Sequence, residues 1–149
     1  MSEGDSLTKA GKYEALYKKL SEAPRDSSFQ ESACREINET MGFLWTGFYF
    51  VKEDRLILGP YFGPPACEMI RKGKGVCGTS WVENRTIVVP DVEEFPGHIA
   101  CSSLSRSEIV IPLRNSEGIV TGVLDIDSEL PDNFDDVDKD CLEKIALLF

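Results

Sequence analysis

A predicted β-hairpin in the second half of the chain constrains the fold more than any other stretch. Two runs rich in β-branched residues, 108–113 and 119–127, lie on either side of the turn-forming sequence Asn115-Ser116-Glu117-Gly118. A hairpin pairs its strands antiparallel, and successive side chains along each strand point to opposite faces. The sequence therefore predicts an antiparallel sheet with a polar face and an apolar face at this point.

Three carboxylates are expected to converge on the polar face of this hairpin. An even-numbered turn centred on Ser116-Glu117 places Glu108 opposite Asp125 and Arg106 opposite Asp127. Directly opposed residues point the same way, so Glu108, Asp125 and Asp127 share a face. Like charges that lie close together and are partly desolvated raise at least one carboxyl pKa. The hairpin is therefore expected to hold a proton donor near neutral pH.

Helices are predicted toward both ends of the chain. Apolar residues recur at i, i+3, i+4 and i+7 over residues 13–20, which indicates an amphipathic helix. Ser28-Phe29-Gln30-Glu31 has the spacing of a capping box, and the helix that it opens is expected to end near Met41-Gly42. Asp135 is placed to cap a last helix. That helix is expected to bury Val137, Cys141, Ile145 and Leu148.

An aromatic strand is predicted over residues 44–51, turning into a second strand over 55–58. Alternation puts Trp45, Gly47 and Tyr49 on one face. Two aromatic residues flanking a glycine leave a notch, which fits either core packing or an aromatic wall for a ligand. From these residues alone, core packing is the better interpretation.

The chain is expected to form one α+β domain over residues 1–149, a mainly antiparallel sheet flanked by N-terminal and C-terminal helices, with residues 1–8 as a flexible N-terminus. Its formal charge of −10 disfavours nucleic acid and anionic membranes as partners. No apolar run approaches a membrane span, and the first residues lack the pattern of a signal peptide. We therefore expect a cytoplasmic protein.

The five cysteines fall into two groups. Cys34 and Cys141 lie on the apolar sides of predicted helices, where a thiol is most simply a small buried hydrophobe. Cys67, Cys77 and Cys101 lie in predicted Gly/Pro-rich loops, where a thiol can be reached. The loop that contains Cys77 is also expected to form an anion-binding nest of carboxylate size at a helix N-terminus.

Three chemistries compete for the loop cysteines. A zinc site could combine them with His98, but their intervals are wider than those of Cys-x-x-Cys pairs. A Cys–His nucleophile for acyl transfer leaves two thiols without a task. In the third chemistry, one thiolate is oxidised by the substrate and a second thiol resolves it as a disulfide. Reduction of a sulfoxide would pair such a thiolate with the protonated carboxyl.

These residues closely resemble the free methionine-(R)-sulfoxide reductases, which are GAF-domain proteins. The resemblance covers nearly the whole chain, and the order and spacing of its blocks argue against chance similarity. The blocks are Trp45-Thr46-Gly47-Phe48-Tyr49, Leu58-Gly59-Pro60, Ala66-Cys67, Gly73-Lys74-Gly75-Val76-Cys77-Gly78-Thr79, Val89-Pro90-Asp91-Val92, Phe95-Pro96-Gly97-His98-Ile99-Ala100-Cys101, Ser107-Glu108-Ile109-Val110 and Leu124-Asp125-Ile126-Asp127.

The resemblance implies an oxidoreductase that uses thiols and needs neither a metal nor a cofactor. Cys101 would be the attacking cysteine, Cys67 would resolve its sulfenic acid as a disulfide, and Cys77 would be an auxiliary thiol. Thioredoxin would regenerate the enzyme, in a role in the response to oxidative stress. A homodimer through the N-terminal helices is also expected.

The resemblance further assigns the substrate-binding residues. Glu108, Asp125 and Asp127 would bind the substrate and protonate the sulfoxide oxygen, in agreement with the hairpin. Trp45 and Tyr49 would enclose the sulfoxide methyl group, which reverses the core-packing interpretation of that face. The main alternative is a GAF sensor module that binds a small molecule without turnover and uses its cysteines as a redox switch.

Overall fold

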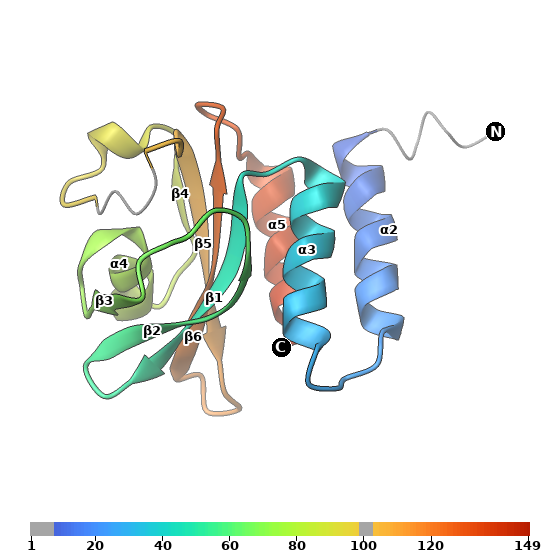
Figure 1. Ribbon diagram of the computed structural model, residues 1–149, viewed down its shortest axis with the longest axis horizontal. Helices are drawn as coiled ribbons and strands as arrows, with labels where there is room; N and C mark the ends of the chain where they lie inside the picture. The colour runs from blue at the N-terminus through green and yellow to red at the C-terminus, as the bar shows by residue number, and fades with distance from the viewer. Residues whose placement is uncertain (1–7, 99–102) are drawn as a thin grey trace.

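The computed structural model describes residues 8–98 and 103–149 (Figure 1). Among these residues, two helices precede the first three strands, one helix and a short 3₁₀ helix lie within the strand region, and one helix follows the last strand. The elements are α2 (Lys9–Glu22), α3 (Phe29–Met41), β1 (Trp45–Lys52), β2 (Arg55–Phe62), β3 (Met69–Arg71), α4 (Gly75–Glu83), β4 (Ile87–Val89), η1 (Val92–Glu94), β5 (Ser107–Arg114), β6 (Val120–Ser128) and α5 (Asp136–Ala146).

The strands form one antiparallel sheet in the order β3-β2-β1-β6-β5-β4. The two predicted hairpins are β1–β2 and β5–β6. They join through β1 and β6, which lie side by side although more than 60 residues separate them in sequence (Figure 1). The predicted α+β domain with an antiparallel sheet is confirmed.

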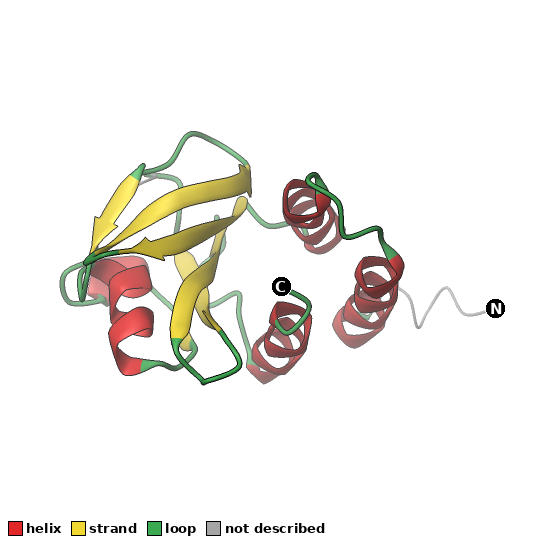
Figure 2. Cartoon of the chain, turned by 90° about the horizontal axis from the view of Figure 1, so that it is seen from below, coloured by secondary structure: helices red, strands yellow, loops and turns green. Residues whose placement is uncertain are grey.

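Helices cover both faces of the sheet. On one face, α3 packs against β1 and β2, α5 packs against β5, and α2 lies outside these two helices (Figures 1 and 2). On the other face, α4 packs against β3, β5 and β6. Each face has its own apolar cluster, one centred on residues such as Phe48 and Leu124 and the other on Trp45, Tyr49 and Val123. No helix among residues 8–98 and 103–149 is both long and apolar enough to cross a membrane.

The predicted capping box at the start of α3 is wrong. The helix begins at Phe29 as expected, but the Ser28 side chain makes no capping hydrogen bond and its backbone is already helical. The Ser28 hydroxyl instead donates to Oδ1 of Asp26 at 2.7 Å. Asp135, in contrast, does cap α5, because its Oδ1 accepts from the N–H groups of Val137 and Asp138.

The predicted register of the β5–β6 hairpin is wrong by two residues. Glu108 pairs with Asp127 rather than with Asp125. The Asn115 N–H donates to the Ile119 carbonyl at 2.9 Å, so the loop has three residues rather than two. A bulge at the turn end of the ladder adds a second one-residue shift. The two shifts together restore the original alternation, so the three carboxylates still share a face.

Two further predictions need correction. The Gly-rich stretch that contains Cys77 is the first part of helix α4 rather than a loop, and Cys77 is buried there. The buried side of α5 is formed by Asp138, Leu142, Ile145 and Ala146, whereas Val137 is exposed. The prediction of a helix was correct, but its buried side was predicted from apolar residues alone. The buried side includes Asp138, and it is therefore turned relative to the predicted one.

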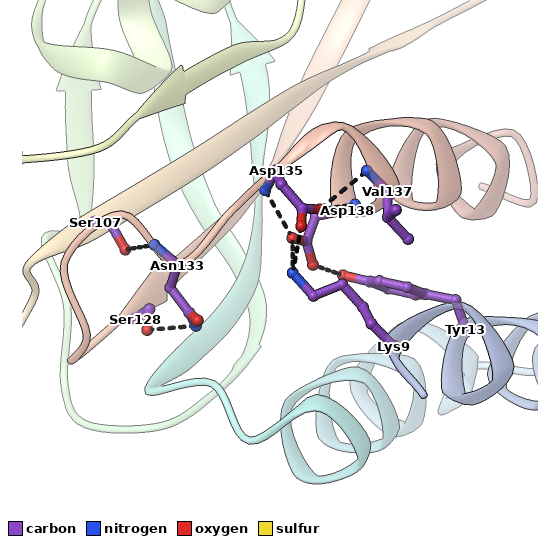
Figure 3. A network of polar contacts seen from close by, with 8 residues as sticks. All are labelled: Lys9, Tyr13, Ser107, Ser128, Asn133, Asp135, Val137 and Asp138. Atoms are coloured by element: carbon purple, nitrogen blue, oxygen red, sulfur yellow. Dashed lines mark hydrogen bonds and ion pairs between the residues drawn. The ribbon is translucent and has the colours of Figure 1, made fainter. Parts of the chain in front are cut away.

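The buried aspartate, Asp138, connects the first helix to the last (Figure 3). The Tyr13 hydroxyl donates to its Oδ1 at 2.6 Å, and the Lys9 ammonium donates to its Oδ2 at 2.7 Å. Lys9 also lies 3.2 Å from Asp135, the cap of α5. Asp138 is 1% exposed, so these partners replace the water that its charge has lost. Helix α2 is therefore held to α5 by a polar network as well as by apolar packing.

We expect Asp138→Ala to lower the free energy of unfolding by about 3 kcal/mol, because it leaves the buried Tyr13 hydroxyl without an acceptor and Lys9 without its closest partner. Urea unfolding measures this change. The matched control is Asp136→Ala, at an exposed position in the same helical turn, with an expected change below about 0.5 kcal/mol. Equal effects of the two substitutions would show that the network does not stabilise the fold.

Candidate active site

The cavity that contains the predicted site residues lies on the α4 side of the sheet. Its wall brings together strands β1, β5 and β6, the start of α4, and the segments that follow β2 and η1. Trp45, Tyr49, Pro65, Ala66, Ile70, Gly75, Val76, Cys77, His98, Ser105, Glu108, Asp125 and Asp127 line it. The structure therefore places six of the eight predicted site residues around one cavity.

Strand pairing explains how the carboxylates meet. β6 runs between β1 and β5, so Asp127 has Trp45 on one side and Glu108 on the other. Asp125, two residues earlier on β6 and on the same face, lies opposite Gly47 of β1. Glu108 and Asp125 are only 5% and 6% exposed.

Gly47 makes room for the aromatic wall. A Cβ atom at this position would lie 2.3 Å from the Trp45 ring and 2.6 Å from the Cβ of Tyr61. The Trp45 ring thus covers the backbone of Gly47, stacks on Tyr61 at 5.4 Å between ring centroids, and lies 6.1 Å from Tyr49. The notch predicted between the two aromatics is real, and the tryptophan ring itself occupies part of it.

Burial raises the pKa of all three carboxyl groups. Desolvation raises the pKa of Glu108 to about 8, and the charge of Asp127 adds to the shift. Desolvation also raises the pKa of Asp125, with the charge of Glu108 as the next cause, and raises that of Asp127, with Asp125 next. Desolvation lowers the pKa of His98, and the interaction of its charge with Asp125 lowers the pKa of that carboxyl less than burial raises it. The cluster therefore holds a proton on Glu108 at neutral pH, which agrees with the raised carboxyl pKa expected for this hairpin.

Hydroxyl groups hold the carboxylate end of the hairpin. The Ser105 hydroxyl donates to Oδ1 of Asp127 at 2.9 Å. Ser107 and Ser128, neighbours of the carboxylates and opposite each other, both bind Asn133, through its N–H and its side-chain amide (Figure 3). The sequence prediction missed Ser105. Its only signal was a hydroxyl three residues before a predicted acid, which is too common to interpret alone.

The predicted catalytic cysteines differ in their settings. Cys77 points from α4 into the cavity and is 3% exposed, and burial raises the pKa of its thiol. Cys67 is disulfide-bonded, and its carbonyl accepts a 2.8 Å hydrogen bond from the Tyr49 hydroxyl, which holds this residue next to the cavity. Cys101 lies outside the described residues. Cys34 is buried in the helical core as predicted, and Cys141 is partly buried.

Two polar atoms in the cavity lining lack partners. Within residues 8–98 and 103–149, the buried side-chain atoms without a hydrogen-bond partner are Nε1 of Trp45 and Oδ1 of Asp125. Buried polar groups are normally paired, so unpaired groups gathered in one place point to a ligand. The cavity combines an unpaired N–H donor, an unpaired carboxyl oxygen and an aromatic wall, which suits a small polar molecule with an apolar end.

Comparison with known proteins identifies the family. The GAF domain family model matches residues 28–149. The chain belongs to the GAF domain family. The matched region begins after α2.

Several relatives of this GAF protein carry the name of one enzyme. GAF domain-containing protein A of Dictyostelium discoideum is 54% identical over 75% of the chain and 71% of that protein. The free methionine-R-sulfoxide reductase of Saccharomyces cerevisiae is 50% identical over 70% of the chain but only 59% of its own length. The Neisseria meningitidis free methionine-R-sulfoxide reductase, solved with its substrate, superposes with a TM-score of 0.86 at 40% identity, covering 95% of this chain and 87% of that one. The resemblance noted in the sequence is confirmed.

The buried carboxyl groups of this GAF domain should make its stability fall as the pH rises. Glu108 has a pKa near 8 when folded and an ordinary value of 4.5, so the folded chain binds more protons between these values. The contribution of Glu108 to the free energy of unfolding is fully present below about pH 4.5 and is lost as the pH rises toward 8. We expect Glu108→Gln, which cannot ionise, to reduce the loss of unfolding free energy between pH 5 and pH 8 by about 3 kcal/mol.

Urea unfolding at the two pH values measures this difference. The matched control is Glu117→Gln in the exposed turn of the same hairpin, which should leave the wild-type pH dependence unchanged. A Glu108→Gln variant whose stability follows pH in parallel with wild type would contradict the proposed burial of a protonated glutamic acid.

Proposed function

We propose that this chain reduces free L-methionine-R-sulfoxide to L-methionine. The observation that carries the proposal is the cavity with three carboxyl groups of raised pKa beside an aromatic pair, Trp45 and Tyr49. The names of the yeast and Neisseria relatives support the choice of substrate and of the R epimer. The activity is an oxidoreduction at sulfur.

In the proposed reaction, the thiolate of Cys101 attacks the sulfoxide sulfur. A carboxyl group of the cluster protonates the sulfoxide oxygen as the sulfur–oxygen bond breaks. Oxygen passes to the cysteine, giving methionine and a cysteine sulfenic acid. The raised pKa values of Glu108, Asp125 and Asp127 keep such a proton available near neutral pH. Asp125 is the donor that we favour, because its Oδ1 lacks a partner among the described residues.

The cavity also offers partners for the rest of the amino acid. Trp45 and Tyr49 would contact the methyl group, and the remaining carboxylates would bind the ammonium group. Helix α4 begins at Gly75, and both Gly75 and Val76 line the cavity. The free N–H groups of a helix N-terminus favour an anion, so we place the substrate carboxylate there.

This arrangement would favour the free amino acid over methionine sulfoxide within a peptide. A peptide has neither the ammonium nor the α-carboxylate of the free amino acid, so binding it would leave buried charged groups unpaired. A site built to bind such groups rejects a substrate that lacks them by large factors.

Regeneration would use the cysteine next to the cavity. We propose that the Cys67 thiol attacks the sulfenic acid of Cys101, releasing water and forming a Cys67–Cys101 disulfide. The disulfide-bonded state of Cys67 supports its role as the resolving cysteine. The dithiol of thioredoxin would then reduce this disulfide, with Cys77 as an auxiliary thiol. A cytoplasmic location and a homodimer through α2 stay predictions, and light scattering would test the second.

Turnover of defined sulfoxides tests the function directly. We expect NADPH oxidation, coupled through thioredoxin reductase and thioredoxin, with free L-methionine-R-sulfoxide. The S epimer and a peptide that contains methionine sulfoxide should give only the background rate. Saturable binding of the R epimer without turnover would contradict the proposal and favour the sensor.

A cysteine series tests the roles of the thiols. We expect Cys101→Ser to lose turnover, because no other thiol takes its place. Cys67→Ser should release one methionine per chain in the absence of external thiol and then stall, because its sulfenic acid is not resolved. Cys34→Ser, in the helical core away from the cavity, should cycle like wild type. Normal thioredoxin-driven cycling of Cys67→Ser would transfer the resolving role to another cysteine.

A further inference from the structure

A second kind of ligand fits the cavity. Cys77, Glu108 and Asp125 each present one ligand atom, and these atoms all lie within 4.8 Å of one another. The three residues come from α4, β5 and β6, so the fold rather than local sequence brings them together. All three are at most 6% exposed.

The unpaired oxygen of Asp125 is independent support for a bound group here. This carboxyl is 6% exposed, and within the described ranges its Oδ1 has no hydrogen-bond partner. By contrast, Oδ1 of Asp127, on the same strand, accepts from Ser105. A cation at the Asp125 oxygen would satisfy an atom that the protein leaves unsatisfied.

His98 is a neighbour of this cluster and does not belong to its three closely spaced ligands. Its Nε2 lies 3.6 Å from Oε1 of Glu108, and its side chain is largely buried at the same cavity. Neighbouring ligand atoms of a tetrahedral zinc site are about 3.5 Å apart, so movements of about 1 Å would bring the atoms of Cys77, Glu108 and Asp125 to that spacing, and the His98 imidazole or a water would complete the four ligands.

We infer that Cys77, Glu108 and Asp125, with His98 beside them, form a binding site for Zn²⁺ or a similar borderline-soft divalent cation. The thiolate and the imidazole select against Mg²⁺ and Ca²⁺, which prefer oxygen ligands in larger numbers. Ligation requires the deprotonated forms of these groups, so the cation binds by displacing the protons that the empty cavity retains. The bound cation would compete with the sulfoxide substrate for the cavity and would take no part in the reduction.

This site differs from the zinc site weighed from sequence. That hypothesis joined Cys67, Cys77 and Cys101 with His98 through loops. In the structure Cys67 is disulfide-bonded, and the partners that surround Cys77 are carboxylates. The cation therefore binds whether or not the Cys67 thiol is free.

Cobalt binding tests the site without any assay of activity. We add Co²⁺ to the oxidised full-length chain, in which Cys67 cannot bind metal. A thiolate on Co²⁺ gives a near-ultraviolet charge-transfer band, expected at one equivalent in wild type and in the matched control Cys34→Ser. Both Cys77→Ser and Cys77→Ala should lose the band while keeping the wild-type circular dichroism. A band that persists without Cys77, or no band in wild type, would overturn the inference.

Zinc affinity then tests the carboxylate ligand. In competition with a chromophoric chelator, Asp125→Asn should weaken Zn²⁺ binding at least tenfold, whereas Glu117→Gln should not change it. Equal affinities of Asp125→Asn and wild type would overturn the assignment of Asp125.

A kinetic consequence rests on the proposed function. Zn²⁺ should raise the KM for the sulfoxide and leave kcat unchanged, because both ligands need the same carboxylates. The two proposals fail separately: turnover without the cobalt band overturns only the metal site, and the cobalt band without turnover overturns only the reductase.

Discussion

The pairing of β6 with both β1 and β5 is the constraint on which the rest of this molecule depends. It places Asp127 between Trp45 and Glu108, and it places Asp125 beside the bare backbone of Gly47. Carboxyl groups buried at this density cannot all ionise, since desolvation and mutual repulsion both oppose the charged forms. The carboxyl groups on the sheet therefore keep protons to higher pH than exposed carboxyl groups do. Their burial lowers the stability of the fold at high pH, and it also supplies the acid that sulfoxide reduction would need.

The two faces of the sheet divide the work between stability and chemistry. The face under α3 and α5 is mostly apolar, and α2 is held outside it by the buried carboxylate of Asp138, which accepts from two side chains of that helix. The face under α4 mixes apolar residues with the carboxyl cluster, and there Asp125 keeps an oxygen without a partner in the described parts of the chain. A satisfied buried charge stabilises a contact between helices, whereas an unsatisfied one is available to a ligand.

The sequence predicted the fold class and the convergence of the carboxylates, because both follow from alternation along strands. The sequence prediction was wrong about features that alternation along strands does not determine, namely the hairpin register and the setting of Cys77. Because of the three-residue loop and the bulge, Glu108 pairs with Asp127 and not with Asp125. The register differs from the predicted one by two residues, an even number, so the three carboxylates still share a face. Cys77 was placed in a loop because glycines surround it, yet those glycines begin helix α4. The contact of Cys77 with Glu108 and Asp125 joins three distant segments, so no local pattern contains it.

A proton held by the buried carboxyl cluster at neutral pH is the central claim, and infrared spectroscopy tests it most directly. At pH 7 the wild-type spectrum should contain the C=O stretch of a protonated carboxyl group, absent from the spectrum of an exposed aspartate or glutamate. Its intensity should fall in Glu108→Gln and in Asp125→Asn and stay unchanged in Asp136→Asn. A wild-type spectrum at pH 7 without this band would contradict the claim, because the carboxyl groups would then be ionised and unable to protonate a sulfoxide oxygen.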